Sequence, residues 1–424
     1  MNPTIRHILF VENGTGIGGA TRCLQGLVRT CRSSGWRVSV AMSYPLAGLE
    51  GPDDDVTVLP LYADAAFQRG QRIRRAQINP GGRAESIARF WSAACLADWP
   101  VARRLARYVR RHRVNLIHAN NDLLVNRVAL LAGRLAGVPV ISHQRGWAQP
   151  SRINNLLERW CARMVAVSDS VQQNLVESGI SSDKVCRIYD GVDVSQYTGA
   201  QDRREAARAE LGFKPEDQVI GLPAVLLPWK GHGLFLDAFA RIAEHRPGVK
   251  ALFVGASPTH AADLLPRLKQ QAAALGLAKR VTWAGHVEDM PSAYAAMDVV
   301  VHASVAPEPF GLVVLEAMAS GRPVLAVDEA GPAEMVRHGV NGWLYPMGDV
   351  NALAEGLSAL LDDPALRERL ARAGRKRAVD FDPTATADAV TTLYDQVLGM
   401  ASDKPDASKW PAPSDRRMQT VAAR

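Results

Sequence analysis

The sequence has 424 residues, 47% of them hydrophobic and 22% charged, and 50 Lys and Arg against 43 Asp and Glu give a formal net charge of +7. This apolar fraction excludes disorder over most of the chain, and the length predicts two or three domains. The most apolar stretch, 123–141, is interrupted by Arg127 and Arg134, so no membrane span is expected, and the run at 8–11 is too short for a secretory signal. We therefore expect a cytoplasmic protein, and its five scattered cysteines predict neither a disulfide framework nor a zinc site.

Short apolar runs alternate with helical patterns in two series along the chain. Alternation of this kind is typical of parallel sheets covered by helices on both faces, so two series predict two doubly wound, Rossmann-like α/β domains. The first series has strand-like runs at 5–12, 37–42, 115–119, 138–143, 164–168 and 184–189, and helical patterns at 18–34, 123–136 and 170–178. The second has strand-like runs at 218–222, 249–254, 281–284, 299–303 and 323–327, and helical patterns at 232–244, 261–274, 310–320 and 350–361.

The pattern lapses into polar residues at 199–208, which sets the expected domain limits. We predict an N-terminal domain over 1–200 and a C-terminal domain over 201–380, followed by a helical stretch within 381–400. Residues 401–424 are rich in Pro, Ser, Asp and Lys, and we predict that this tail is disordered.

The positive charge is concentrated in residues 60–113, where twelve Arg stand against three acidic residues. A helix over 101–113 would place Arg103, Arg107, Arg110 and Arg111 on one face and apolar residues around the other side. Two interpretations stay open: an anionic surface such as phospholipid or a lipid-phosphate acceptor binds here, or the arginines form a solvated helix face. The segment has no recognition motif or interleaved aromatic residues that would indicate a nucleic-acid partner.

Three motifs follow strands at the edge where ligands of parallel sheets bind. The first, Asn13-Gly-Thr-Gly-Ile-Gly-Gly-Ala20, follows the first strand and opens a helix, where glycines let a phosphate approach the backbone. It is not a clean G-x-G-x-x-G, and no acidic residue follows the second strand as a dinucleotide fingerprint requires. We favour a phosphate or substrate loop over a plain tight turn.

The other two motifs belong to the second series. Lys230, after the first strand of that series, could neutralise a diphosphate, although a surface lysine is an ordinary alternative. Glu308 precedes a helix that Pro309 suits at its start, and Glu316 lies on that helix. The two carboxylates could hold sugar and ribose hydroxyls; a helix cap with an exposed glutamate, or a glycosidase pair, are the alternatives.

Glu308 through Glu316 resembles the glutamate–seven residues–glutamate signature of the family 4 glycosyltransferases. Further pieces resemble that family in order and spacing and extend the resemblance from about Ile5 to Leu398: Gly-Gly at 18–19, Asn-Leu-Ile-His-Ala at 115–119, Ala-Val-Ser-Asp-Ser at 166–170, Asp-Gly-Val-Asp at 190–193, Pro-Trp-Lys-Gly at 228–231 and Gly-Val-Asn-Gly-Trp-Leu at 339–344.

The resemblance implies the GT-B fold, in which two facing Rossmann-like domains enclose a cleft. It also implies a nucleotide-sugar donor held mainly by the C-terminal domain, an acceptor held by the N-terminal domain, and retention of anomeric configuration without an essential metal or other cofactor. By this resemblance Lys230 binds the donor diphosphate, Glu308 the sugar hydroxyls and Glu316 the ribose. The remaining donor contacts that it implies are Gly18, Gly19, Val287, Phe310, Gly311 and Leu312.

Two histidines end strands of the first series, where a structural role and a functional one are equally compatible with the sequence. His118 lies in a piece that resembles the family, whose members place a histidine near the reacting sugar, so we count it with Glu308 and Lys230 as catalytic. His143 and Arg145 could meet the acceptor, and Asn120 and Asp122 are weaker candidates beside them.

One position departs from the family. Many members carry an arginine five residues before the lysine, where this sequence has Val225. One cation of the expected pair is therefore missing, and Arg22, Arg145 or His232 could replace it.

The resemblance, together with the basic segment, implies a retaining hexosyltransferase that moves a sugar from a nucleotide diphosphate sugar to a lipid-linked or polysaccharide acceptor at the cytoplasmic membrane face. The alternatives are proteins of the same fold: a nucleotide-sugar epimerase, a glycogen-type phosphorylase, or a binding protein that has lost turnover, which Val225 would permit.

Overall fold

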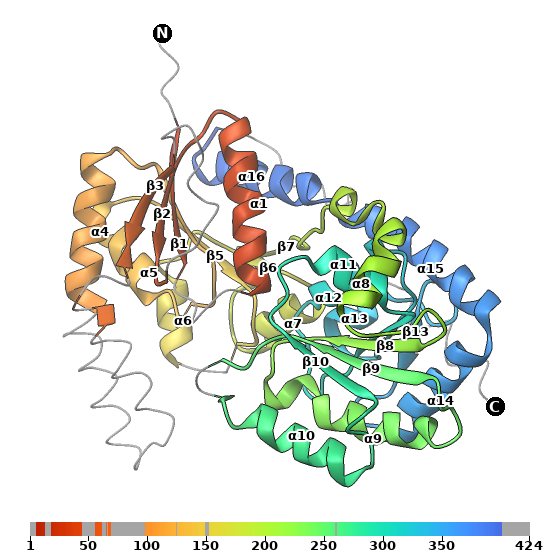
Figure 1. The fold of residues 1–424 in the computed structure, drawn as a ribbon. Coiled ribbons are helices and arrows are strands. Elements are labelled where there is room, and N and C mark those ends of the chain that lie inside the picture. Colours follow the sequence, from red (N-terminus) through yellow and green to blue (C-terminus); the bar gives the residue numbers. More distant parts are fainter. Residues whose placement is uncertain are drawn as a thin grey trace. The chain divides into compact units, whose positions relative to one another are not determined.

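The computed structural model describes residues 6–12, 18–44, 56–61, 65, 67–68, 98–123, 125–148, 152–258 and 261–400 (Figure 1). The predicted loop at 13–17, most of the basic segment and the tail at 401–424 lie outside these residues. The described residues fall into two units, unit 1 (6–190 and 383–400) and unit 2 (191–382). The division after Asp190 comes earlier than the predicted boundary at 200, and the helical stretch from Pro383 belongs to unit 1.

Unit 1 contains a seven-stranded parallel sheet with the order β3-β2-β1-β4-β5-β6-β7. Its central strands are buried on both faces, as their continuous apolar sequences predict. The strand order reverses between β1 and β4, and side chains that follow these strands are therefore in the position where doubly wound sheets bind ligands. The strands are β1 (His7–Glu12), β2 (Arg37–Met42), β3 (Val56–Pro60), β4 (Leu116–Ala119), β5 (Val140–Gln144), β6 (Arg163–Ala166) and β7 (Val185–Arg187).

The helices of unit 1 connect these strands. They are α1 (Gly19–Ser33), α4 (Trp99–Arg111), α5 (Arg127–Ala136), α6 (Arg152–Glu158), α7 (Asp169–Glu177) and α16 (Pro383–Val397). The last of these lies beside α1, and the ring of its buried Tyr394 packs edge-on against Trp36 at 5.5 Å between centroids (Figure 1). The packing of Tyr394 therefore ties the end of the described chain into the core of unit 1.

Unit 2 contains a six-stranded parallel sheet with the order β10-β9-β8-β11-β12-β13, which reverses between β8 and β11. The strands are β8 (Gln218–Pro223), β9 (Val249–Val254), β10 (Val281–Gly285), β11 (Val299–His302), β12 (Val324–Val327) and β13 (Trp343–Tyr345). The helices are α8 (Arg204–Glu210), α9 (His232–Ala243), α10 (Leu264–Ala274), α11 (Met290–Ala296), α12 (Leu312–Ala319), α13 (Ala330–Met335), α14 (Val350–Asp362) and α15 (Pro364–Ala378). The prediction of two doubly wound α/β domains is confirmed.

The core of unit 2 lies between the sheet and the helices α9 and α14, which pack on each other. Phe235 and Phe239 of α9 are fully buried, and the Phe235 ring meets that of Phe253 in β9 at 5.3 Å. Complete burial of one such side chain contributes about 1.5–3 kcal/mol. This packing fixes α9, and with it the loop that precedes it, against the carboxyl end of β8.

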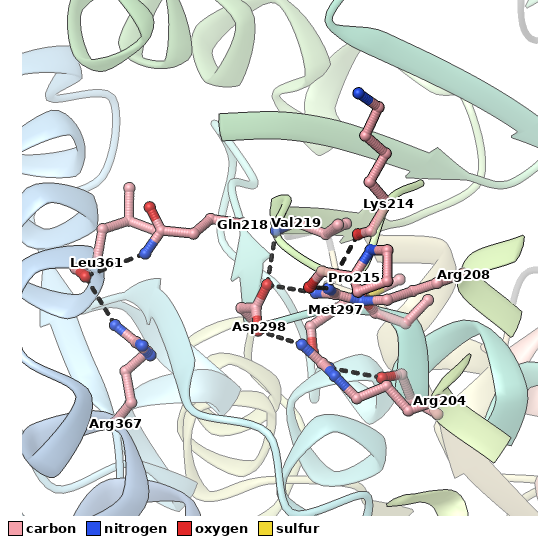
Figure 2. Close-up of polar contacts among 12 residues, drawn as sticks. Arg204, Arg208, Lys214, Pro215, Gln218, Val219, Met297, Asp298, Leu361 and Arg367 are labelled. Atoms are coloured by element: carbon pink, nitrogen blue, oxygen red, sulfur yellow. Dashed lines mark hydrogen bonds and ion pairs between the residues drawn. The ribbon is translucent and has the colours of Figure 1, made fainter. Parts of the chain in front are cut away.

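At the amino end of the same sheet, Asp298 joins α8 to the strands (Figure 2). Its carboxylate accepts hydrogen bonds from the backbone N–H of Val219 at 2.7 Å, from Arg208 at 2.6 Å and from Arg204. Arg204 also donates to the carbonyl of Met297 at 3.0 Å. Because Arg204 and Arg208 precede β8, Val219 is near its start and Asp298 precedes β11, the cluster is at the opposite end of the strands from the candidate ligand site.

Two further observations concern the chain as a whole. Within the described residues, no helix has both the length and the apolar composition that a membrane crossing requires. The four cysteines in those residues, Cys23, Cys31, Cys161 and Cys186, are free.

Candidate active site

Lys230 lies in the loop between β8 and α9, at the end of a 3₁₀ turn over Pro228–Lys230. The next residue, Gly231, has a φ of +71°, and a Cβ there would overlap the carbonyl oxygen of Ala303. Only glycine permits so close an approach in this conformation. The backbone N–H of Val305 also donates to the carbonyl of Trp229 at 2.8 Å. The loop after β8 is therefore held against the loop after β11.

The second loop carries Glu308, which is buried and forms an ion pair with Lys230. The same carboxylate oxygen, Oε2, accepts from Ser304 Oγ at 3.1 Å and lies 3.3 Å from His302 Nε2. Burial by itself would raise the pKa of Glu308, but the Lys230 ammonium and the hydrogen bond from His302 outweigh it and lower this pKa to about 2. Glu308 is therefore a carboxylate at neutral pH.

The segment after Glu308 turns into α12. Gly311 has a φ of +97° and begins this helix, and no described side chain caps it. The uncapped first N–H groups carry the positive end of the helix dipole, which favours an anion. The carbonyl of Glu308 accepts from the N–H of Gly331 at 3.1 Å, and the buried Phe310 lies between these residues and α12.

Glu316 lies one turn into α12 and is buried, so the alternative of an exposed helical glutamate is excluded. Its Oε2 accepts a hydrogen bond from the Tyr294 hydroxyl at 2.7 Å. The other predicted donor contact, Val287, follows β10, and no contact within the described ranges joins it to Lys230 or Glu308.

In unit 1 the two predicted histidines lie together at the carboxyl ends of β4 and β5. The rings of His118 and His143 are 5.4 Å apart, and His118 Nδ1 is 2.6 Å from the Tyr394 hydroxyl of α16. Burial lowers the pKa of His118 to about 3 and that of His143 well below its ordinary value. Both rings are neutral at physiological pH, so each offers one hydrogen-bond donor and one acceptor.

Arg145 follows β5 and is ion-paired with Asp190. It also reaches Asn120 Oδ1 at 3.4 Å, and Asn120 donates in turn to Glu12 at the end of β1. Asp122 follows β4, and burial raises its pKa to about 6 against backbone hydrogen bonds from the Arg145 and Gly146 N–H groups. The edge of the sheet therefore carries a connected polar cluster in which the charge of Arg145 is already balanced.

Gly18 and Gly19 lie at the start of α1, directly after residues 13–17. Gly18 is the N-cap of the helix and has an extended backbone that any residue can adopt. A Cβ there would meet nothing within 4 Å, so contacts among the described residues do not require glycine.

Comparison with known proteins places the chain in a family. Residues 17–196 match the family described as Glycosyltransferase Family 4, and residues 203–377 match Glycosyl transferases group 1. The D-inositol 3-phosphate glycosyltransferase of Nocardia farcinica is 30% identical over 362 residues, which are 84% of this chain and 74% of that protein. This chain is a family 4 glycosyltransferase. It is therefore an enzyme, and the resemblance found in the sequence is confirmed.

Further relatives of the glycosyltransferase support the assignment of its fold. The crystal structure of HepE from Anabaena in complex with UDP and glucose is 28% identical, has a TM-score of 0.76 and covers 92% of this chain and 100% of its own. HepE has also been solved with UDP-glucose, at a TM-score of 0.74. The phosphatidyl-myo-inositol mannosyltransferase of Mycobacterium leprae is 32% identical over 257 residues, 59% of this chain and 64% of that protein. The GT-B fold of the glycosyltransferase is thus shown.

One of the predicted substitutes for the missing cation is wrong. His232 is buried against the ring of Phe253, and burial lowers its pKa to about 4, so it is neutral at physiological pH. Arg145 is ion-paired with Asp190, and its role as a substitute, like that of Arg22, stays a prediction. Val225 itself is exposed beside the Lys230 loop, which leaves Lys230 as the cation that the described structure brings to Glu308.

Sequence reasoning missed four residues of the two clusters: His302, Ser304, Glu12 and Asp190. All of them end a strand or follow one closely, so the strand-end rule that selected His118 could also have selected these. Among the residues that the structure describes, no group of three or more His, Cys, Asp or Glu side chains is arranged to hold a metal ion.

Proposed function

We propose that this glycosyltransferase moves a sugar, with retention of anomeric configuration, from a nucleotide diphosphate sugar to a lipid-linked or polysaccharide acceptor at the cytoplasmic membrane face. The observation that carries the proposal is the Lys230–Glu308 pair, formed where β8 and β11 of unit 2 end at the reversal of strand order. Such a point is where doubly wound sheets bind their ligands.

Lys230 can bind the diphosphate of a nucleotide sugar, and Glu308 can bind its sugar. Cleavage of the sugar–phosphate bond builds negative charge on the departing nucleotide, and Lys230 with the N-terminus of α12 supplies positive charge there. Glu308 is a carboxylate that can accept hydrogen bonds from sugar hydroxyls, and Glu316 can do the same for a ribose. These roles are those that the family resemblance implies for the same residues.

The UDP and UDP-glucose complexes of HepE make uridine diphosphate sugars the first donors to test, with guanosine diphosphate sugars next because two relatives are named mannosyltransferases. The acceptor proposal rests on the polar cluster of unit 1. Neutral His118 and His143, with Arg145 balanced by Asp190, offer both donors and acceptors, which is what hydroxyl groups require. A lipid-linked or glycan acceptor also agrees with relatives named for phosphatidylinositol and lipopolysaccharide core.

The stereochemistry of the product tests this function. The glycosyltransferase is incubated with isotope-labelled α-linked UDP-glucose or GDP-mannose and with membrane lipid extract or capsular and cell-wall glycan. We expect label in the lipid or glycan fraction as an α-linked sugar, read from the anomeric signals in NMR spectra. A β-linked product would contradict retention, and an epimerised donor without transfer would favour the epimerase alternative.

We further propose that transfer needs no metal ion, because Lys230 and the start of α12 supply the positive charge that a metal would otherwise provide. The initial rate of transfer is expected to stay within about twofold after dialysis against EDTA. A loss of more than tenfold that Mg²⁺ or Mn²⁺ restores would contradict this part of the proposal.

Membrane association is proposed to rest on α4. Its apolar residues Val101, Leu105 and Val109 are buried in unit 1, where the helix packs on α5, so this apolar face cannot enter a bilayer. The opposite face exposes Arg103 and Arg107, and neither α4 nor α5 contains an acidic residue. Attachment through this face would therefore be electrostatic, at about 1 kcal/mol for each arginine near an anionic surface.

Charge reversal at Arg103→Glu and Arg107→Glu tests this surface. Because attraction becomes repulsion at two positions, binding to vesicles of phosphatidylglycerol is expected to weaken at least tenfold, and wild-type binding should weaken as salt rises. Flotation measures both effects. The matched control reverses two exposed arginines of unit 2, Arg241→Glu and Arg369→Glu, and should bind like the wild type. Equal loss in both double variants, or binding that ignores salt, would contradict a role for α4.

A further inference from the structure

One oxygen of Glu308 carries all of the side chain's polar contacts. Oε2 meets the Lys230 ammonium, accepts from Ser304 Oγ at 3.1 Å and lies 3.3 Å from His302 Nε2. Ser304 Oγ and His302 Nε2 are themselves 3.1 Å apart. The other oxygen, Oε1, receives no hydrogen bond from any residue that the structure describes. Oε1 is therefore available to a ligand.

The other two partners of Oε2, His302 and Ser304, lie on a well-packed part of the unit 2 sheet. His302 is the last residue of β11, is 3% exposed and pairs in register with Ala326 of β12. Its carbonyl accepts a hydrogen bond from the Tyr345 hydroxyl of β13 at 3.4 Å. Ser304 is completely buried. The fixed backbone of His302 and the burial of both residues restrict how far either side chain can follow Glu308 if the carboxylate moves.

The hydrogen-bond geometry shows which atoms of this cluster carry protons. His302 Nδ1 is buried and has no hydrogen-bond partner among the described residues, whereas Nε2 faces the carboxylate oxygen Oε2, which can only accept, so Nε2 carries a proton. Nε2–H then donates toward Oε2 and Ser304 Oγ, and the serine hydroxyl donates to Oε2. Both donors point at the same oxygen, so the carboxylate keeps its charge and its orientation without depending on Lys230 alone.

We propose that His302 and Ser304 are positioning residues of the donor site, which clamp Glu308 through Oε2 and thereby aim Oε1 at the hydroxyl groups of the donor sugar. This inference rests on the proposed function of Glu308. The clamp has a clear use in that function, because the three N–H groups of Lys230 must also serve the donor diphosphate. When Lys230 donates hydrogen bonds to the diphosphate, His302 and Ser304 still hold the Glu308 carboxylate in place.

A pair of substitutions at one position separates positioning from general stability. In His302→Gln the side-chain amide nitrogen stands about as far from the backbone as Nε2 and can still donate to Oε2. In His302→Asn the amide is one carbon shorter and cannot reach it. Both variants are polar and of similar size, so they share the cost of losing the buried ring, which thermal unfolding measures.

Binding is measured by calorimetry with UDP-glucose, or with GDP-mannose if UDP-glucose does not bind, and with the matching UDP or GDP. In His302→Asn we expect affinity for the nucleotide sugar to fall at least tenfold and affinity for the nucleoside diphosphate to stay within about twofold. His302→Gln should keep nucleotide-sugar affinity within about threefold. Ser304→Ala should lower the affinity for the nucleotide sugar but not that for the nucleoside diphosphate. The double variant Ser304→Ala with His302→Asn should lower the affinity for the nucleotide sugar more than either single substitution.

A second measurement needs no ligand. The side-chain carboxyl carbon of Glu308, followed by NMR against pH, should report a higher pKa in His302→Asn than in His302→Gln, because only the longer amide still donates to Oε2. Equal effects of the two His302 variants, or equal losses for nucleotide sugar and nucleoside diphosphate, would overturn the clamp. Failure of the wild type to bind either nucleotide sugar would instead remove the proposed function, and the clamp's purpose with it.

Discussion

Replacing Lys230 by methionine is expected to lower kcat for sugar transfer by a factor of about 10²–10³. The ammonium is held beside Glu308 at the switch point of the unit 2 sheet, where the departing diphosphate gains negative charge. Methionine keeps the length of the side chain and removes the charge. The effect should lie toward the upper end of this range because Val225 and the neutral His232 supply no second cation beside the loop. Release of nucleoside diphosphate from the nucleotide sugar, measured with membrane acceptor present, gives kcat and KM.

Two controls accompany this variant. Lys269→Met removes an exposed lysine of α10 and should leave kcat unchanged. Lys230→Arg keeps the charge in a larger and differently shaped group, so it should recover part of the rate. A change of less than about fivefold in Lys230→Met, with the protein folded, would show that the leaving group does not depend on Lys230.

Asp298→Asn is expected to lower the free energy of unfolding by an amount toward the lower end of the about 3–5 kcal/mol that removing one partner from a buried ion pair usually costs, because the Asp298 and Arg204 side chains are 18% and 19% exposed. Asp298 accepts from Arg204, Arg208 and the N–H of Val219, and the Arg208 side chain is only 5% exposed (Figure 2). The amide has nearly the shape of the carboxylate but carries no charge, so both guanidinium groups lose their counter-ion. Denaturation by urea, monitored by circular dichroism, measures the change.

The matched control for this prediction is Asp362→Asn. Asp362 pairs with Arg246, but the two side chains are 64% and 24% exposed, so this pair should contribute at most about 1 kcal/mol. A loss of less than 1 kcal/mol for Asp298→Asn would mean that solvent screens the cluster despite its burial. The variant should leave nucleotide-sugar affinity unchanged under conditions where it is folded, because Asp298 precedes β11 whereas the candidate site follows it.

The strands of both sheets could largely be predicted because most are short apolar runs between helical patterns. Two were missed for identifiable reasons. β3 (Val56–Pro60) is an edge strand whose residues are all at least partly exposed, and it ends in proline, which cannot donate to a sheet ladder. β13 (Trp343–Tyr345) has only three residues and is defined by its pairing with β12. Both strands are too short for their sequences to show a clear periodicity of apolar residues.

Lys230 and Glu308 could be selected from the sequence because each follows a strand on either side of the reversal in strand order. Their neighbours could not be assigned in the same way. Whether His232 is a cation depends on its burial against Phe253, and whether Arg145 is free depends on Asp190, which is 45 residues away in the chain. The contacts of His302 with Glu308 likewise depend on the path of the loop after β11. Contacts between residues that are far apart in the sequence determine the charge and the orientation of these side chains, and a local sequence pattern shows neither.

The most direct test of the donor site is a calorimetric comparison of the wild type with Glu308→Gln, each titrated with a nucleotide sugar and with the matching nucleoside diphosphate. Because Glu308 is proposed to hold the sugar and Lys230 the phosphates, the substitution should weaken the nucleotide sugar by at least about tenfold and leave the nucleoside diphosphate within about twofold. Equal affinity of the two proteins for the nucleotide sugar, or equal loss for both ligands, would contradict this assignment of the site.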